Sequence, residues 1–484
     1  MDSSLWHRLL PEKESSLPLY RQVAEGILHL AEEGQMKANE KLPPIRTLAA
    51  TLGVNPSTVA AAYRYLEQKK AVYSRVGSGT FLSPIPLTEL PEERTKFSVS
   101  MWKRPVLAEG AVNFTDTSLP PELFPTDAFR QAINTLLEEE QGAAFGRMDI
   151  QGYYPLREAV CRFLEDYGIR TWPENIQILS GAQQGLDVVS KAMMKYGDVI
   201  FTERPTFYGA VGAFLGRGCQ VVEISMEKDG VDLVELETMA KLYHPRFFYM
   251  MAYFQTPTGV TYSAKKKRKL LELAEKYDFF LVEDDNLYDF CYHDQTITPM
   301  KAIDHRGRVI YLKSLSKILM PGLRMGFAVF PRKMLLQMME AKYTTDIATS
   351  GFLQKALTRY LEENCWQDHI ARIRAYGRAQ YRMAVKYAER YLADTFSFLR
   401  PEGGLSLWLT PRGFSAEEAL RRAAREQIFL SPGSQFDLGT EESQALRLSF
   451  IHTPEGKMES GIRRLGRIAN ALQQEGKGEL TLEK

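Results

Sequence analysis

The hydrophobic pattern of residues 19–82 predicts three helices followed by a hairpin. Apolar positions recur every three or four residues over 19–33 and again over 45–53, which is the spacing of helices with one buried face. Asn55 can cap a third helix whose first position is Pro56. Two short strand-forming runs then flank a Gly-Ser-Gly turn between residues 72 and 82. Helix, helix-turn-helix and hairpin follow one another in the order of a winged-helix domain.

Residues 84–110 interrupt this periodicity. Four prolines alternate there with charged residues, a composition typical of a semi-extended linker. A chain of 484 residues also exceeds what one hydrophobic core normally supports. We therefore expect a DNA-binding domain over residues 1–83, a linker over 84–110 and an effector and dimerisation domain over 111–484.

From residue 112 onward, short apolar strands alternate with helical segments. This alternation predicts an α/β fold with a large, mainly parallel sheet covered on both faces. Long helices over 343–393 and two later strands indicate a smaller α+β lobe. The predicted strands are 176–179, 198–201, 220–224, 246–251, 279–282, 308–312, 326–330, 405–409 and 446–450.

Charge is distributed unevenly along a chain whose net charge is only +1. Residues 1–40 contain four basic and seven acidic side chains, whereas residues 41–83 contain six basic and one acidic. A local basic face suits the phosphate backbone of nucleic acid. A solvated basic surface is an equally open interpretation of the charge alone.

Cysteine usage and hydropathy exclude several classes of protein. The four cysteines are scattered without a C-x-x-C pair, so we expect neither a metal site nor a disulfide framework. The N-terminus lacks a charged-then-apolar leader, and no run of 18 apolar residues occurs. We therefore expect a cytoplasmic protein without a membrane segment.

Lys317 is the residue most informative about chemistry. It follows Ser314 in a Ser-Leu-Ser-Lys run and precedes Arg324 by seven positions. A lysine amine condenses with an aldehyde, while hydroxyls and a guanidinium can hold a phosphate dianion. This combination suits a Schiff base, an internal aldimine, between Lys317 and pyridoxal phosphate.

Further segments supply the other parts of such a pocket. Ala182 and Gln183 open a predicted helix, where their backbone N–H groups can face an anion. Phe207 offers an aromatic face for the pyridine ring, with Tyr208 as the alternative. Thr256 lies in a turn from which a polar group can reach the ring hydroxyl.

Two charged residues complete this set. Asp284 follows a predicted strand, at an edge where open α/β sheets bind ligands, and its carboxylate can pair with the protonated pyridine nitrogen. Arg447, at the start of a strand in the smaller lobe, can clamp a substrate carboxylate with two hydrogen bonds. Each residue alone has a simpler interpretation, such as a helix cap, a core side chain or a surface ion pair. The ordered conjunction of these segments favours the cofactor pocket.

The N-terminal pattern from Pro18 to Phe81 resembles GntR-type winged-helix regulators over about 65 residues. In such domains the second helix of the helix-turn-helix motif enters the major groove. Taken alone, an arginine such as Arg46 is more often a surface residue, and a Gly-Ser-Gly run is usually only a tight turn. The candidate DNA contacts are Arg46, Asn55, Ser57 and Thr58, together with Arg75, Gly77 and Gly79 in the wing.

Residues 110–475 resemble fold-type I pyridoxal-phosphate enzymes of the aspartate aminotransferase class, and the whole chain resembles the MocR/GabR subfamily of GntR regulators. The resemblance implies a homodimer with swapped, head-to-tail DNA-binding domains and a cofactor near the subunit interface. It also implies Lys317 as the internal aldimine and Asp284 on the ring nitrogen. Around the phosphate it implies Ser314, Arg324, Ala182 and Gln183.

Two positions depart from the pattern of active enzymes. Thr256 stands where the Asn-Pro-Thr-Gly motif has asparagine, and Asn286 stands where relatives carry a tyrosine, so that the nearest phenol is Tyr288. Both missing groups contact the ring O3′ and tune proton transfers there. We therefore expect amine binding to be retained and transaminase turnover to be weak or absent.

Three functions are compatible with this sequence. The one we favour is a transcription regulator that binds double-stranded operator DNA and senses pyridoxal phosphate, an amino compound or both through Lys317. The alternative is a genuine aminotransferase with an appended DNA-binding domain. The third is a DNA-binding protein whose large domain only dimerises and binds no cofactor.

Overall fold

The computed structural model describes Trp6, Leu9, Pro11 and residues 17–32, 35–36, 40–68, 71–75, 79–82, 107–108, 110–293, 297–363, 366–438 and 444–482. The chain forms two compact units, Met1–Ser98 and Val99–Lys484. Most of the expected linker lies outside the described residues. None of the described helices combines the length and the apolar character needed to span a bilayer.

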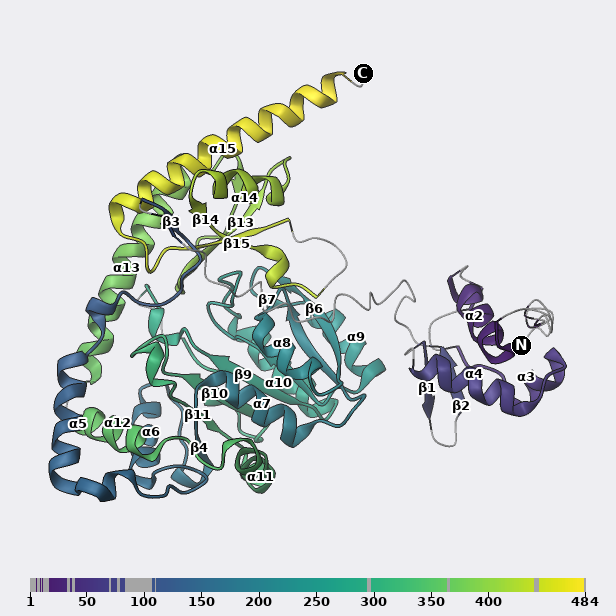
Figure 1. The fold of residues 1–484 in the computed structure, drawn as a ribbon, viewed down its shortest axis with the longest axis horizontal. Helices are drawn as coiled ribbons and strands as arrows, with labels where there is room; N and C mark the ends of the chain where they lie inside the picture. The colour runs from purple at the N-terminus through teal and green to yellow at the C-terminus, as the bar shows by residue number, and fades with distance from the viewer. Residues whose placement is uncertain are drawn as a thin grey trace. The chain divides into compact units, whose positions relative to one another are not determined.

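The N-terminal unit has the predicted winged-helix order of elements (Figure 1). Gly53 ends the second helix at φ 64°, in the left-handed region that favours glycine, and so allows the tight turn into the third helix. The hairpin pairs its two strands antiparallel, with Tyr73 stacked on Phe81. The elements are α2 (Leu19–Glu32), α3 (Ile45–Leu52), α4 (Pro56–Gln68), β1 (Val72–Arg75) and β2 (Gly79–Leu82).

Each helix of this unit contributes one apolar face to a common core. The buried side chains recur at the spacing predicted from the sequence, so the exposed faces remain polar. The one buried phenol, that of Tyr63, donates to the Pro43 carbonyl at 2.7 Å, which anchors α4 to the segment before α3. The core contains Val23, Ala24, Ile27, Leu30, Leu48, Ala49, Leu52, Val59, Ala62 and Leu66.

An eight-stranded mixed sheet forms the centre of the C-terminal unit, in the order β4-β11-β10-β9-β8-β5-β6-β7. The central strands β10, β9, β8, β5 and β6 are parallel, as predicted. Strand β11 runs antiparallel to both of its neighbours. The strands are β4 (Ile176–Leu179), β5 (Val199–Arg204), β6 (Gln220–Glu227), β7 (Gly230–Val231), β8 (Phe247–Met250), β9 (Phe280–Asp285), β10 (Val309–Ser314) and β11 (Gly326–Val329).

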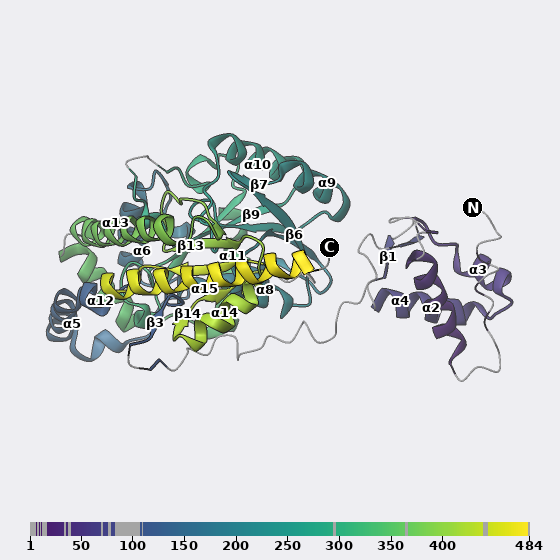
Figure 2. The same cartoon turned by 90° about the horizontal axis from the view of Figure 1, so that it is seen from above.

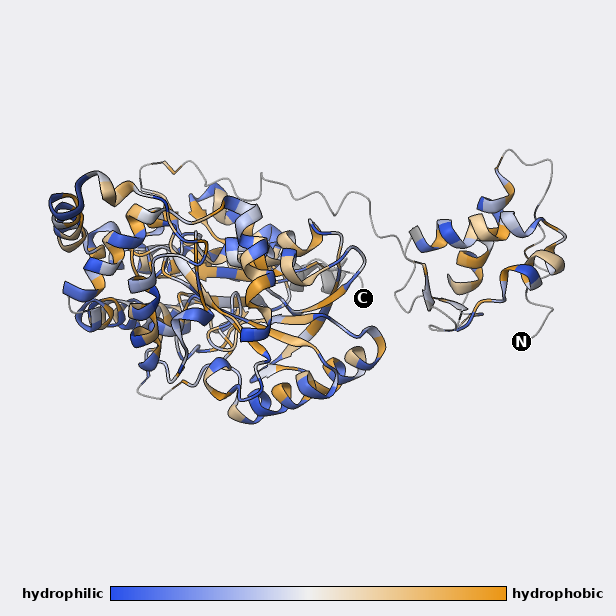
Figure 3. Cartoon of the chain, turned by 90° about the horizontal axis from the view of Figure 1, so that it is seen from below, coloured by the Kyte–Doolittle hydropathy of each residue, from blue (hydrophilic) through white to orange (hydrophobic). Residues whose placement is uncertain are grey.

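Both faces of this sheet are buried. Successive side chains of β8 alternate between two cores: Phe248 and Met250 enter one, and Phe247 and Tyr249 enter the other. The strands are accordingly apolar on both sides, whereas hydrophobic and hydrophilic residues alternate along most of the covering helices (Figure 3). These helices are α5 (Thr126–Glu140), α6 (Tyr154–Glu165), α7 (Ala182–Met193), α8 (Tyr208–Leu215), α9 (Leu233–Tyr243), α10 (Ala264–Lys276), α11 (Leu335–Asp346) and α12 (Gly351–Glu363).

The smaller lobe is built around a four-stranded sheet in the order β12-β13-β16-β15. The long helices α13 and α15 lie side by side in it (Figure 2). A short strand from before the large lobe, β3 (Val112–Asn113), pairs in parallel with β14 (Ile428–Phe429). The other elements are α13 (Trp366–Tyr391), β12 (Phe396–Ser397), β13 (Ser406–Pro411), α14 (Ala416–Arg425), β15 (Ser431–Pro432), β16 (Leu446–Ser449) and α15 (Glu455–Leu482).

Candidate cofactor site and DNA-binding surface

A cavity of about 340 Å³ lies at the carboxyl ends of β9 and β10, where the sequence predicted the cofactor pocket. This volume is within the range of small-molecule sites. The smaller lobe and the segment Asp116–Ser118 close its other side. Nine predicted residues line the cavity: Ala182, Gln183, Phe207, Thr256, Asp284, Ser314, Lys317, Arg324 and Arg447.

One end of the cavity is built to hold an anion. Helix α7 begins there at Ala182, and its N-cap Gly181 has no side chain to occupy the free backbone N–H groups. Arg324 reaches the same place, where its Nη1 donates to Ser316 Oγ at 3.3 Å. A Cβ on Gly181 would lie 2.8 Å from Arg324 Nη2, so glycine is required for this approach. A helix N-terminus beside a guanidinium fits a phosphate group.

Asp284 presents an unpaired acceptor at the other end. Its Oδ2 accepts a hydrogen bond of 2.7 Å from the Tyr249 hydroxyl, whereas its buried Oδ1 has no partner among the described residues. Burial raises the pKa of Asp284 to about 6, with a further upward contribution from Asp285 that the Tyr249 bond and Lys313 oppose. A buried carboxylate with one unsatisfied oxygen fits a cationic ring nitrogen.

A buried ion cluster fixes the strand ends beside Asp284. Lys313 on β10 is fully buried and contacts Asp285 on β9 at 3.0 Å and Asp289 at 2.8 Å. Tyr167 donates to the same Asp289 carboxylate at 2.5 Å. The Lys313–Asp285 pair thus connects the ends of β10 and β9. Separating them would leave a buried charge without its partner, which is strongly unfavourable.

Lys317 lies in the segment after β10 and is held by Thr117. Its Nζ donates to the Thr117 carbonyl at 3.0 Å and also to the Thr117 hydroxyl. Burial lowers the pKa of Lys317 to about 8, and the nearby Arg447 lowers it further, while Asp116 opposes the shift. A lowered pKa increases the neutral fraction of the amine, which is the nucleophilic form.

Arg447 on β16 faces the cavity from the smaller lobe. Its Nη2 donates to Ser431 Oγ at 2.9 Å and to the Thr115 carbonyl at 3.2 Å, and its guanidinium lies 5.0 Å from the centre of the Phe436 ring. Its buried Nε has no hydrogen-bond partner among the described residues. Burial lowers the pKa of this guanidinium to about 10, so Arg447 remains cationic near neutrality.

The aromatic and turn residues are positioned by glutamine side chains. Phe207, rather than Tyr208, lines the cavity, and a Cβ on Gly209 would lie 2.5 Å from the Phe207 ring. Gln183 Nε2 donates to the Gly209 carbonyl at 2.7 Å, which links this segment to α7. Gln255 fixes the turn that carries Thr256, since its Oε1 accepts from the Thr258 hydroxyl at 2.6 Å.

Tyr288 is not brought to the cavity. Its ring packs 4.1 Å from that of Tyr167, and its backbone N–H donates to Asp285 at 3.0 Å. Asn286 lines the cavity instead. Sequence reasoning also missed Thr117 and Tyr249, because Thr117 lies 200 positions before Lys317 and Tyr249 belongs to an apolar strand pattern.

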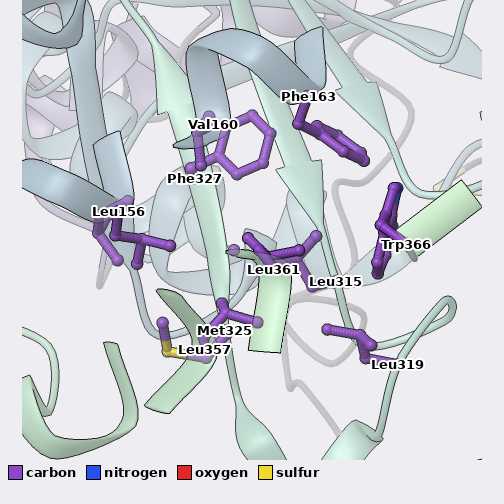
Figure 4. A pocket seen from close by; sticks show the side chains of 12 residues that line it. Leu156, Val160, Phe163, Leu315, Leu319, Met325, Phe327, Leu357, Leu361 and Trp366 are labelled. Carbon is purple, nitrogen blue, oxygen red and sulfur yellow. The ribbon is translucent and has the colours of Figure 1, made fainter. Parts of the chain in front are cut away.

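A second, apolar cavity carries no site. It lies between α6, β11 and α12 and is lined by side chains such as Leu156, Phe327 and Trp366 (Figure 4). Its volume of about 10 Å³ hardly admits one water molecule, and the indole of Trp366 is the one polar side chain in its lining, fewer than the two to four partners that a buried water needs. This cavity is a packing gap in the core.

Four of the DNA-binding candidates that the structure describes are exposed: Arg46, Asn55, Ser57 and Gly79. Asn55 Oδ1 accepts from the Ser57 N–H at 2.9 Å and from the Ser57 hydroxyl at 2.8 Å, so the Asn55 side chain caps α4. Arg46 is exposed at the start of α3, and Thr58 is half-buried on α4. Gly79 opens β2 at φ 113° beside Lys41. Gly77 and the Arg75 side chain lie outside the described residues.

Two families of known proteins match separate parts of the chain. Residues 19–82 match the bacterial regulatory proteins of the gntR family, and residues 112–465 match the aminotransferases of class I and II. The probable rhizopine catabolism regulatory protein MocR of Rhizobium meliloti is 27% identical over 97% of each chain. Aromatic-amino-acid aminotransferase 1 of Thermococcus litoralis is 33% identical over 71% of this chain and 84% of its own.

A solved structure supports the same assignment. The α-aminoadipate aminotransferase LysN of Thermus thermophilus, complexed with N-(5′-phosphopyridoxyl)-L-leucine, aligns with a TM-score of 0.71 and 30% identity over 78% of this chain and 96% of its own. The match to MocR, in contrast, covers 97% of this chain rather than 78%. The chain therefore belongs to the class I and II aminotransferase family and carries the GntR domain that makes it a regulator of the MocR type.

Proposed function

We propose that the cofactor cavity of this GntR-type regulator controls DNA binding by its winged helix. The signal is pyridoxal phosphate, an amino compound that reacts at Lys317, or both. One observation carries the proposal: a chain with a winged-helix unit also contains a cavity in which a buried Asp284 oxygen has no hydrogen-bond partner among the described residues. A large domain that served only for dimerisation would have no use for that unpaired acceptor.

The residues present fit pyridoxal phosphate, which is the cofactor of this family. When bound, it supplies an aldehyde that reacts with amines and a ring that withdraws electrons. Lys317 would hold the aldehyde, Asp284 the ring nitrogen, Phe207 the ring face and Thr256 the ring hydroxyl. The phosphate would lie among Ala182, Gln183, Ser314 and Arg324.

Arg447 indicates the chemistry of the effector. Its cationic group faces the cavity and keeps one buried N–H donor without a partner among the described residues. A carboxylate is the group that best satisfies a guanidinium, because it accepts two parallel hydrogen bonds. We therefore infer that the effector is an amino compound with a carboxylate.

A genuine aminotransferase is the second candidate, supported by the 33% identity to an aromatic amino acid aminotransferase. The site is less suited to turnover. Asn286 and Thr256 line the cavity, and the phenol of Tyr288 is packed against Tyr167. Loss of groups that tune proton transfer slows catalysis and leaves amine exchange possible. Sustained keto-acid production from an amino acid would favour the enzyme over the regulator.

The experiment that tests the proposal uses the full chain and pyridoxal phosphate. The chain should acquire an imine absorbance that is lost in Lys317→Ala and kept in Lys269→Ala, a matched variant of an exposed lysine. A gel-shift with the DNA flanking the gene should change with added pyridoxal phosphate in the parent chain and not in Lys317→Ala. A colourless chain, or DNA binding indifferent to the cofactor, would refute the proposal.

We also propose that the regulator is a homodimer. Leu336, Tyr343 and Ile347 lie seven and four positions apart along α11 and its end, with exposed fractions of 76%, 52% and 60%. The spacing of seven places Leu336 and Tyr343 on one face of α11, and Ile347 caps the carboxyl end of the helix with φ 66°. An exposed apolar stripe of this kind is typical of an interface, and a second copy of the chain is the partner we infer.

Substitution within this stripe tests the dimer. Ile347→Asp should shift the chain to a monomer in analytical ultracentrifugation, because a buried unpaired carboxylate opposes association. Leu399→Asp, at another exposed apolar residue, is the control and should leave the mass unchanged. If both variants remained dimers, α11 would not be part of the interface.

A further inference from the structure

The Lys317 amine joins two parts of the chain that are far apart in sequence. Lys317 belongs to the large lobe, three residues after β10. Its two acceptors, the carbonyl and the hydroxyl of Thr117, belong to a segment 200 residues earlier. This contact lies inside the cavity, since both residues line it.

The segment that carries Thr117 is fixed to the smaller lobe. Ser449 on β16 donates from its hydroxyl to the Asp116 carbonyl at 2.6 Å and from its N–H to the Phe114 carbonyl at 2.8 Å. Arg447 donates to the Thr115 carbonyl at 3.2 Å. Strand β3, directly before this segment, pairs with β14. The Lys317–Thr117 contact therefore connects the large lobe to the smaller one.

Covalent chemistry at Lys317 is incompatible with the full contact. When the amine condenses with an aldehyde, a C=N bond forms to Nζ and the carbonyl oxygen leaves as water with two hydrogens from Nζ. The nitrogen then carries one hydrogen at most, so it cannot donate to both oxygens of Thr117. Condensation must break at least one of the two hydrogen bonds.

We propose that Thr117 is the positioning residue that holds the free Lys317 amine, and that its two oxygens compete with the cofactor aldehyde for this amine. This inference rests on the proposed function and adds a way to regulate it. An amino compound that displaces Lys317 returns the amine to Thr117 and restores the link between the lobes. Occupation of Arg447 by a carboxylate acts on the same segment, through the neighbouring Thr115.

The test compares the affinity of pyridoxal phosphate for matched variants of the full chain. Thr117→Val removes the hydroxyl at constant shape and should tighten binding by about threefold to tenfold, the net effect of one hydrogen bond. Thr117→Ser restores the hydroxyl and should return the affinity to the parent value. Thr238→Val removes the hydroxyl of an exposed threonine on α9 and serves as the control. Affinity is measured by titrating the imine absorbance.

A second readout works without the cofactor. In the cofactor-free chain, thermal unfolding of Thr117→Val, Lys317→Met and the double variant gives the coupling between the two side chains. We expect the double variant to depart from the sum of the single effects. Equal affinities in all Thr117 variants, or additive unfolding effects, would overturn the role of Thr117 while leaving the proposed function intact. Loss of the imine band from the parent chain would instead overturn both.

Discussion

The cofactor cavity and the recognition surface of the winged helix hold their polar groups in opposite ways. In the cavity, Asp284 is buried and Lys317 and Arg447 are half-buried, and each is oriented by hydrogen bonds inside the protein. On the winged helix, Arg46 and Ser57 are exposed, and the Ser57 hydroxyl donates to the side chain of Asn55, which precedes α4. A buried site can be interpreted from the protein alone because its geometry is complete. The operator sequence that the winged helix recognises is determined by contacts between its exposed side chains and the bases, which only a complex with DNA contains.

The largest expected effect separates the two units. Leu66 is fully buried in the winged-helix core, and Leu66→Ala should cost about 2–5 kcal/mol, enough to unfold a small unit. DNA binding in a gel-shift should be lost while the imine absorbance with pyridoxal phosphate persists. Glu67→Ala, at the exposed neighbouring position, should preserve both. Loss of the absorbance in Leu66→Ala would show that the cavity depends on the winged helix.

The next effect probes how firmly the cavity is organised. Asp284→Asn removes the charge that would pair with the ring nitrogen, and pyridoxal phosphate affinity should fall on the order of 100-fold, as when a buried ion pair is broken. Titration of the imine absorbance measures this loss. Asp187→Asn, which breaks a half-exposed pair with Arg217, should leave the affinity unchanged. If Asp284→Asn bound pyridoxal phosphate with the parent affinity, the Asp284 carboxylate would not be the partner of the ring nitrogen.

The same carboxylate should make the cofactor-free chain sensitive to pH. Asp284 has a pKa of about 6 in the folded chain and about 3.9 when unfolded, so the folded chain binds the proton more tightly. Its contribution to the free energy of unfolding therefore falls as pH rises from about 4 through 6. The free energy of unfolding of Asp284→Asn should exceed that of the parent by roughly 3 kcal/mol at pH 8, and the difference should vanish as the pH falls below about 4. Urea unfolding at several pH values measures this, and a constant difference would contradict it.

The smallest effect is expected on the recognition surface. Arg46→Ala should weaken DNA binding by roughly tenfold, because one charge-assisted contact is lost. If the contact is to phosphate, the loss should be uniform across sequences, and the salt dependence should decrease by about one counterion. Fluorescence anisotropy at several salt concentrations distinguishes this from a base contact. Unchanged affinity would exclude Arg46 from the interface.

The sequence predicted the parts of the fold that repeat a local rule. Helical and strand periodicities located the winged helix and the central strands, and the ordered motifs located most of the cavity, including Asp284 and Lys317. Small residues before a helix and a carboxylate after a strand are local signals of ligand sites. These signals can be recognised in a single sequence because the residues that bind the ligand are also those at the start of a helix or the end of a strand.

Contacts between distant segments were not predictable in this way. Nothing in the pattern around Thr117 indicates that it meets Lys317, because the pairing depends on β3 joining the smaller lobe. The antiparallel direction of β11 is also a property of the assembled sheet. Tyr288 was placed near the ring by its position in the chain, whereas aromatic packing on Tyr167 takes it elsewhere. At Asn55 the side chain is engaged in local capping, a competing use that the sequence leaves open.

The pairing of β3 with β14 has a mechanical consequence. Among the residues that the structure describes, the first strand or helix after Leu82, where the wing hairpin ends, is β3, which begins 30 positions later and belongs to the smaller lobe. Residues 112–113, which follow the segment between the two units, thus pair with the smaller lobe and not with the central sheet. Any rotation of the smaller lobe would therefore move β3 together with β14.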